Sequence, residues 1–130
     1  MAEGDPLIAP YISGVRSNLE QYKWEGDKVI ENAIPVEMPA VPLVELLRKH
    51  NAPQVIDFAT FDIEGSEFKV LESFPFDEYC FLTLTVEADE WVWEKLLAIL
   101  EPHGYREVQN PFNPHIWEKY CVHERAIAGF

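Results

Sequence analysis

Apolar residues from position 42 onward switch between helical and strand-like spacing. Over Pro42–His50 the leucines recur every three or four residues, and Pro53 ends that pattern. The next run, Gln54–Ile63, is apolar with few polar interruptions, as expected for a strand that is covered on both faces. The pattern therefore predicts a helix followed by a buried strand.

The same alternation continues towards the carboxyl terminus. A helix is predicted to begin at Glu64 and to end at Pro75, and Cys80–Val86 is a continuous strand pattern. Glu90–Glu101 has an amphipathic pattern, and Gly104 is suited to a left-handed stop after it. Strands that alternate with helices predict a parallel α/β sheet.

Two short strands are predicted at the end of the chain, at Tyr105–Val108 and Tyr120–His123. The loop between them is rich in Pro and Asn and is too short for a crossover helix, so the two strands should pair antiparallel. The predicted fold class is α/β, with parallel strands, an antiparallel carboxy-terminal pair and flanking helices.

The amino-terminal residues have weaker patterning. Residues 1–27 are expected to form an irregular segment with one helical turn around Ser17–Tyr22. Lys28–Met38 has strand character, and Pro35 makes it an edge or irregular strand. The expected organisation is an irregular segment, 1–27, followed by a single α/β domain, 28–130.

The net charge and the cysteines indicate which partners the protein can bind and in which cell compartment it is expected. The net charge of −13 argues against a nucleic-acid partner and against an anionic membrane surface. Met1–Asp5 lacks the pattern of a signal peptide, and no apolar run is long enough to span a membrane. Cys80 and Cys121 are expected to be buried free thiols, although a single disulfide stays open. A cytoplasmic protein is expected.

An acidic turn after the strand at Gln54–Ile63 is the main candidate for chemistry. Asp62 ends that strand, Glu64 is expected at the start of the next helix, and Gly65 lets the backbone turn closely. Ligands of open α/β sheets bind at the carboxyl ends of the strands. Asp62 and Glu64 can therefore hold a cation, accept a hydroxyl proton or lie near a sulfonium, or alternatively cap the helix. Glu87 ends the next strand and is the third candidate, whereas Glu67 is expected to be a first-turn or surface carboxylate.

The remaining reactive and aromatic residues favour structural roles. The histidines lack metal-ligand spacing, so no metal site is predicted. Cys121 and His123 should face the same side of a strand, but no third group to orient such a pair is apparent. Core and sheet packing is the expected role of the aromatic residues Trp91, Trp93, Trp117 and Tyr120.

The stretch Ile56–Leu71 resembles the signature of FkbM-type methyltransferases, in which an apolar strand ends in an Asp-x-Glu-Gly-x-Glu turn and a helix follows. The resemblance extends over about residues 40–123 and includes the Val-Glu that ends the strand at Glu87 and the Gly-Tyr at Gly104. It implies a Rossmann-like methyltransferase sheet and O-methyl transfer from S-adenosylmethionine (SAM) to a small molecule or glycan. Asp62, Glu64 and Glu87 would then be catalytic candidates, and Gly65 would be a candidate for cofactor binding.

The resemblance implies only a partial sheet, the carboxy-terminal half of such a domain. Members of this family hold SAM through a Gly-rich turn after the first strand, and this sequence has six isolated glycines and no Gly-x-Gly. Three hypotheses stay open: a methyltransferase of short form or completed by another chain, a binding or assembly module that is inactive as an isolated chain, and a metal-dependent activity of the acidic turn.

The missing half would also leave the strand at Gln54–Ile63 with an open apolar edge, which is a liability for aggregation. The segment Lys28–Met38 can fold over this edge, or two copies of the chain can pair there. The expected partners are therefore a second copy of the chain or a complementing chain, together with a small-molecule substrate.

Overall fold

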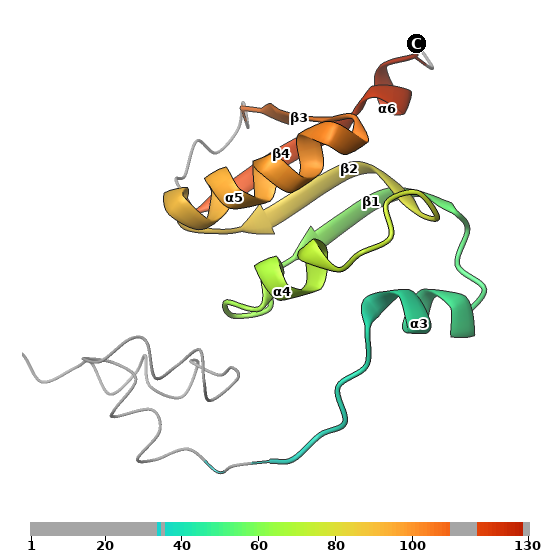
Figure 1. Ribbon diagram of the computed structural model, residues 1–130, viewed down its shortest axis with the longest axis vertical. Helices are drawn as coiled ribbons and strands as arrows, with labels where there is room; N and C mark the ends of the chain where they lie inside the picture. The colour runs from blue at the N-terminus through green and yellow to red at the C-terminus, as the bar shows by residue number, and fades with distance from the viewer. Residues whose placement is uncertain (1–33, 35, 110–116, 129–130) are drawn as a thin grey trace, which may run out of the picture. The chain divides into compact units, whose positions relative to one another are not determined.

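The computed structural model describes residue 34, residues 36–109 and residues 117–128 (Figure 1). The predicted irregular segment 1–27, with its helical turn at Ser17–Tyr22, lies outside these residues. Of the predicted strand Lys28–Met38, the described residues are Ile34 and residues 36–38, and none of these four is in a strand.

The chain divides into two compact units. The smaller unit comprises Met1–Ala40 and Ile63–Ser66, and the larger unit comprises Val41–Asp62 and Glu67–Phe130. All helices and strands of the described residues belong to the larger unit.

The described strands form one four-stranded mixed sheet in the order β1-β2-β4-β3. Strands β1 and β2 are parallel, and β4 is antiparallel to both of its neighbours, β2 and β3. The strands are β1 (Val55–Phe61), β2 (Cys80–Glu87), β3 (Tyr105–Val108) and β4 (Glu118–His123). The predicted α/β class is confirmed, and so is the antiparallel carboxy-terminal pair. Strand β4 lies inside the sheet, and β3 lies at the edge of the sheet.

The helices α3 (Leu43–Lys49), α4 (Glu67–Glu72) and α5 (Glu90–Leu100) lie in the stretches where the apolar spacing predicts helices. The 3₁₀ turn η2 (Glu101–His103) follows α5, and a short helix that was not predicted, α6 (Glu124–Ala128), follows β4. Gly104 ends η2 in the left-handed conformation with φ 89°, as predicted.

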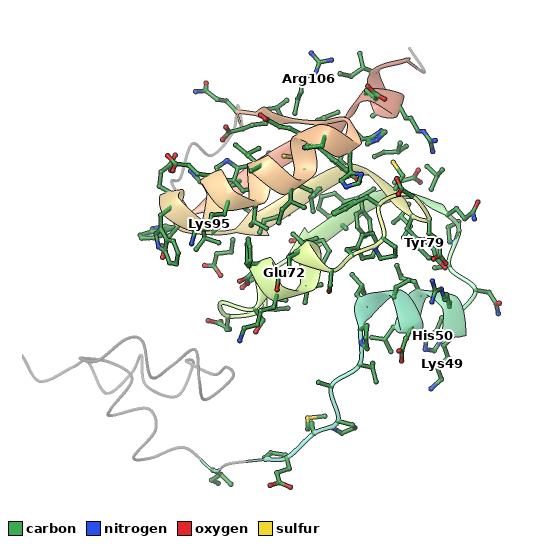
Figure 2. All side chains as sticks on the ribbon, in the orientation of Figure 1. Lys49, His50, Glu72, Tyr79, Lys95 and Arg106 are labelled. Carbon is green, nitrogen blue, oxygen red and sulfur yellow. The ribbon has the colours of Figure 1, made fainter. Side chains whose placement is uncertain are left out.

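The hydrophobic core lies between the sheet and the helices α4 and α5. Figure 1 shows these two helices side by side across one face of the sheet, and they pack against each other. Trp93, Leu96 and Leu100 of α5 and Leu71 of α4 are buried there against Leu84 of β2. Burial of each such side chain contributes about 1.5–3 kcal/mol, and Figure 2 shows how densely the side chains fill this layer.

The start of α4 differs from the prediction. The helix begins at Glu67 rather than at Glu64, because Glu64 and Gly65 have φ values of 55° and 88°. A right-handed helix requires φ near −60°, so these two residues form a turn that precedes the helix.

Strand β1 lies at one edge of the sheet. Within the described residues it pairs on one side only, with β2. Val55 and Phe58 on this strand are 41% and 56% exposed, which is unusual for a strand of such apolar sequence.

Both cysteines are free and buried, as predicted. No helix among the described residues is long and apolar enough to cross a membrane.

Candidate functional site

Two of the three predicted carboxylates lie side by side at the carboxyl ends of the parallel strands. Phe61 of β1 is the register partner of Val86 of β2, and Asp62 and Glu87 are the next residue on each chain segment. Both side chains are exposed. The sheet therefore brings together Asp62 and Glu87 at the edge where open α/β folds bind their ligands.

Glu64 and Gly65 belong to the smaller unit, in the turn that follows Asp62 along the chain. Both have left-handed backbones, which cost a residue with a Cβ atom about 1–2 kcal/mol. The residue directly before α4 is Ser66. The capping role of Asp62 and Glu64 stays a prediction.

Glu67 is the first residue of α4, so it lies in the first turn, as predicted. It is not at the surface, because only 3% of its area is exposed. It lies four residues before the fully buried Leu71, on the same face of the helix. That spacing is the sequence signal for its burial. The positive end of the helix dipole favours a carboxylate at this place.

The carboxyl edge continues onto β4. Glu87 is the register partner of Glu118, and the hydroxyl of Tyr120 donates a hydrogen bond of 3.0 Å to Oε2 of Glu118. Lys119 forms an ion pair with Glu90, with 2.6 Å between Nζ and Oε2. Three carboxylates, Asp62, Glu87 and Glu118, thus follow one another along this edge.

Two tryptophans predicted to pack in the core are exposed beside these carboxylates. Trp91 and Trp117 are 58% and 54% exposed, whereas Trp93 is buried and donates its indole N–H to Oε1 of Glu107 at 2.8 Å. The spacing of α5 explains the difference, because Trp91 lies on the face of the helix away from Trp93. The prediction of core packing is correct for Trp93 and wrong for Trp91 and Trp117.

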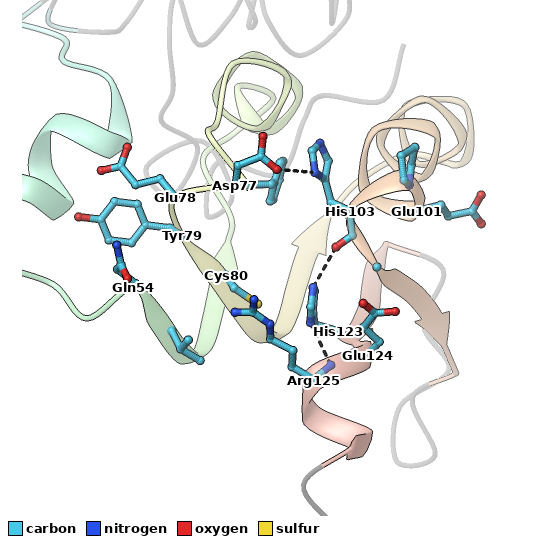
Figure 3. Close-up of a pocket in the computed structure, with 14 residues that line it drawn as sticks. Gln54, Asp77, Glu78, Tyr79, Cys80, Glu101, His103, His123, Glu124 and Arg125 are labelled. Carbon is cyan, nitrogen blue, oxygen red and sulfur yellow. Dashed lines mark hydrogen bonds and ion pairs between the residues drawn. The ribbon is translucent and has the colours of Figure 1, made fainter.

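A cavity of about 570 Å³ lies at the opposite end of the sheet, at the amino ends of β1 and β2. Nothing in the sequence pattern predicts this cavity. Figure 3 shows His103, His123 and Arg125 around it, with His123 between the other two. The backbone N–H of Arg125 donates to Nδ1 of His123 at 3.0 Å, so Nε2 must carry the ring proton and donate it to the carbonyl of His103 at 2.9 Å.

These contacts exclude a Cys–His catalytic pair. Cys121 and His123 do face the same side of β4, as predicted. Both are buried, and the burial of His123 was not predicted. Both ring nitrogens of His123 are engaged by backbone groups, so neither can take a proton from a thiol. Burial also raises the pKa of Cys121 to about 12, with Glu107 and Glu101 as lesser causes, and burial raises the pKa of Cys80. Both thiols are therefore protonated near neutral pH, which makes them poor nucleophiles.

His50 and His103 both lie at helix ends. His50 is the C-cap residue of α3, and His103 ends η2 with its Nδ1 3.9 Å from Oδ1 of Asp77. His115 lies outside the described residues. Within the described part of the chain, no group of three His, Cys, Asp or Glu side chains is placed to hold a metal ion.

Comparison with known protein families identifies the family to which the fold belongs. Residues 3–107 match the methyltransferase FkbM domain. The match begins upstream of the stretch that carries the resemblance in the sequence and ends within β3. No curated protein matches the chain, and no solved structure matches it. Because the match covers more than half of the 130 residues, the chain belongs to the FkbM methyltransferase domain family.

Proposed function

We propose that the chain serves SAM-dependent methyl transfer to a hydroxyl group, and that Asp62 and Glu87 act on the acceptor side of the reaction. The observation that supports this most directly is their adjacency at the carboxyl ends of β1 and β2. Membership of the FkbM family supports the reaction class.

Methyl transfer to an alcohol requires a group that takes the hydroxyl proton. A carboxylate within hydrogen-bonding reach of the hydroxyl can do so and at the same time orient it. Asp62 and Glu87 are exposed and adjacent, so one can accept the proton while the other holds a neighbouring hydroxyl. Glu64 follows two residues after Asp62 and stays a prediction for the same role.

The described residues fit the acceptor side better than the cofactor. Carboxylates at this edge suit hydroxyl groups. Gly65 has φ 88°, and its role in cofactor binding stays a prediction. A Gly-rich turn that would cradle the cofactor is absent from the sequence, whose six glycines are isolated. When bound, SAM supplies an electrophilic methyl group, and the contribution of the described residues is to position the acceptor.

The isolated glycines favour a second candidate, a binding or assembly module that keeps the fold without catalysis. Titration calorimetry of the full chain with SAM and with S-adenosylhomocysteine separates the two. Micromolar binding supports the methyltransferase. The absence of both heat and a thermal shift at millimolar ligand overturns it for this chain and leaves the module.

A pair of matched substitutions tests the role of Asp62. With methyl-labelled SAM and a panel of polyhydroxylated acceptors, we expect Asp62→Asn to lower transfer about 10²–10⁴-fold, the usual contribution of a positioned base. Asp77→Asn is the control, because Asp77 is fully exposed at the opposite end of the sheet. Equal activity of both variants would remove Asp62 from the proposal.

A cytoplasmic place of action is part of this proposal. Its support is the pair of free, buried thiols, Cys80 and Cys121, since oxidising compartments favour disulfides.

A further inference from the structure

We infer that the carboxyl edge of the sheet binds a neutral or amino saccharide, whose ring stacks on Trp91 and Trp117 while its hydroxyls donate to the neighbouring carboxylates. This inference rests on the proposed function, because it names the class of acceptor for that edge. Its observations are the exposure of two tryptophans and their position beside Glu87.

Both tryptophans are anchored within a few residues of Glu87. The backbone N–H of Ala88, the residue after Glu87, donates to the carbonyl of Trp117 at 2.8 Å. Trp91 is the second residue of α5, three positions after Ala88. The two indoles therefore extend from backbone segments that meet directly at the end of β2.

Exposure of both rings needs a reason, because burial of a large apolar side chain contributes about 1.5–3 kcal/mol. Trp93, two residues along the same helix, is buried with 1% of its area exposed, so α5 has room for an indole in the core. Trp91 is held in place at the surface, with Nζ of Lys95 4.4 Å from the centre of its ring. Figure 2 labels Lys95 at α5.

The carboxylates beside these rings supply hydrogen-bond acceptors. Glu87 and Glu118 are direct register partners on β2 and β4, an arrangement of like charges that destabilises a sheet by itself. Glu118 is oriented by the hydroxyl of Tyr120. Ionised carboxylates only accept hydrogen bonds, so their natural ligands at this edge are O–H and N–H groups.

Flat aromatic rings flanked by acceptors match the two surfaces of a sugar. The C–H face of a pyranose packs on an indole, and the hydroxyls around its rim donate to carboxylates. The net charge of −13 disfavours sulfated or uronic saccharides, which leaves neutral or amino sugars.

The test uses the full chain without SAM, so that its outcome is independent of methyl transfer. Maltohexaose, cellohexaose and chitosan hexamer are titrated by calorimetry and by tryptophan fluorescence. We expect at least one to bind with a Kd of about 1 mM or tighter. Trp91→Ala and Trp117→Ala should each weaken that binding at least about tenfold, equivalent to 1.4 kcal/mol.

Ile127→Ala is the control, because Ile127 is exposed to a similar degree, 52%, on α6. Thermal melts establish that all variants are folded. Failure of all three sugars to bind, or binding by the tryptophan variants equal to that of the wild type, overturns the inference. Sugar binding without SAM binding would support it while the transferase proposal fails, and SAM binding without sugar binding would do the reverse.

Discussion

Replacement of Gly104 by alanine perturbs the turn between η2 and β3 in two separable ways. The first is the backbone, which has φ 89°. An L-residue in the left-handed region costs about 1–2 kcal/mol. Alanine regains about 0.4–1 kcal/mol because it restricts the unfolded chain. The net backbone effect is a loss of about 0.5–1 kcal/mol by these two estimates.

The second effect is packing. A Cβ atom at position 104 would lie 3.0 Å from Cδ of Glu124 and 3.1 Å from Nε2 of His123. The end of the Glu124 side chain is exposed and can move away. His123 is held at both ring nitrogens, so a shift of its ring weakens the 2.9 Å hydrogen bond to His103. Such a bond contributes about 0.5–1.5 kcal/mol.

Together these terms predict that Gly104→Ala lowers the free energy of unfolding by about 1–2.5 kcal/mol. At roughly 3–5 °C per kcal/mol for a domain of this size, Tm should fall by about 3–12 °C. Thermal and urea unfolding, followed by circular dichroism, measure both quantities.

A double-mutant cycle separates the two terms. In a His123→Ala background, the cost of Gly104→Ala should shrink by about 0.5–1.5 kcal/mol, because the packing term disappears and the backbone term remains. In a Glu124→Ala background the cost should be unchanged. A Gly104→Ala protein that melts at the wild-type temperature would refute both terms of the reasoning.

Two further predictions concern pH and association. Because the pKa of Cys121 is raised from 9.0 to about 12 in the folded protein, the unfolded chain loses this proton first as pH rises, and stability should fall between those values. Urea titrations at several pH values give the slope of the unfolding free energy against pH. In Cys121→Ala this slope should be smaller by up to about 1.4 kcal/mol per pH unit. An unchanged slope would contradict the raised pKa of Cys121. Within the described residues β1 pairs on one side only, and we predict that two copies of the chain pair at its other edge. Light scattering should give the mass of a dimer, and Phe58→Lys should shift it to a monomer. A monomeric wild type at high concentration would refute this pairing.

The strands were predictable where side-chain spacing alone decides the structure. Tyr105–Val108 is a strand with the predicted bounds, and β2 extends one residue beyond the prediction, to Glu87. Gly104 has the predicted left-handed backbone. In each case a strand or a stop is specified by a few neighbouring residues, and tertiary contacts agree with the local preference.

Two kinds of prediction failed. One depends on the backbone conformation of a single residue, and the other depends on which parts of the folded protein surround a side chain. Nothing in the spacing around Glu64 shows that a residue with a Cβ atom would adopt φ 55°, so the start of α4 was placed three residues early. Trp91 and Trp117 were assigned to the core from their hydrophobicity, whereas exposure depends on which surfaces surround them. For the candidate site, the strand ends identified Asp62 and Glu87, but the tryptophans beside them required the structure.

The strand order also has a consequence for the sequence of events in folding. Of the four described strands, β4 is synthesised last, yet it lies between β2 and β3. Until residues 118–123 have left the ribosome, β3 has no neighbour to pair with, and the side of β2 that β4 will occupy is open. At that stage β2 exposes the edge that β4 will occupy, and β1 has β2 as its neighbour among the described strands, which is a state prone to association. The final dozen described residues therefore determine whether the preceding strands become a sheet, and ribosome-bound chains that stop before Glu118 should need chaperones more than chains that include His123.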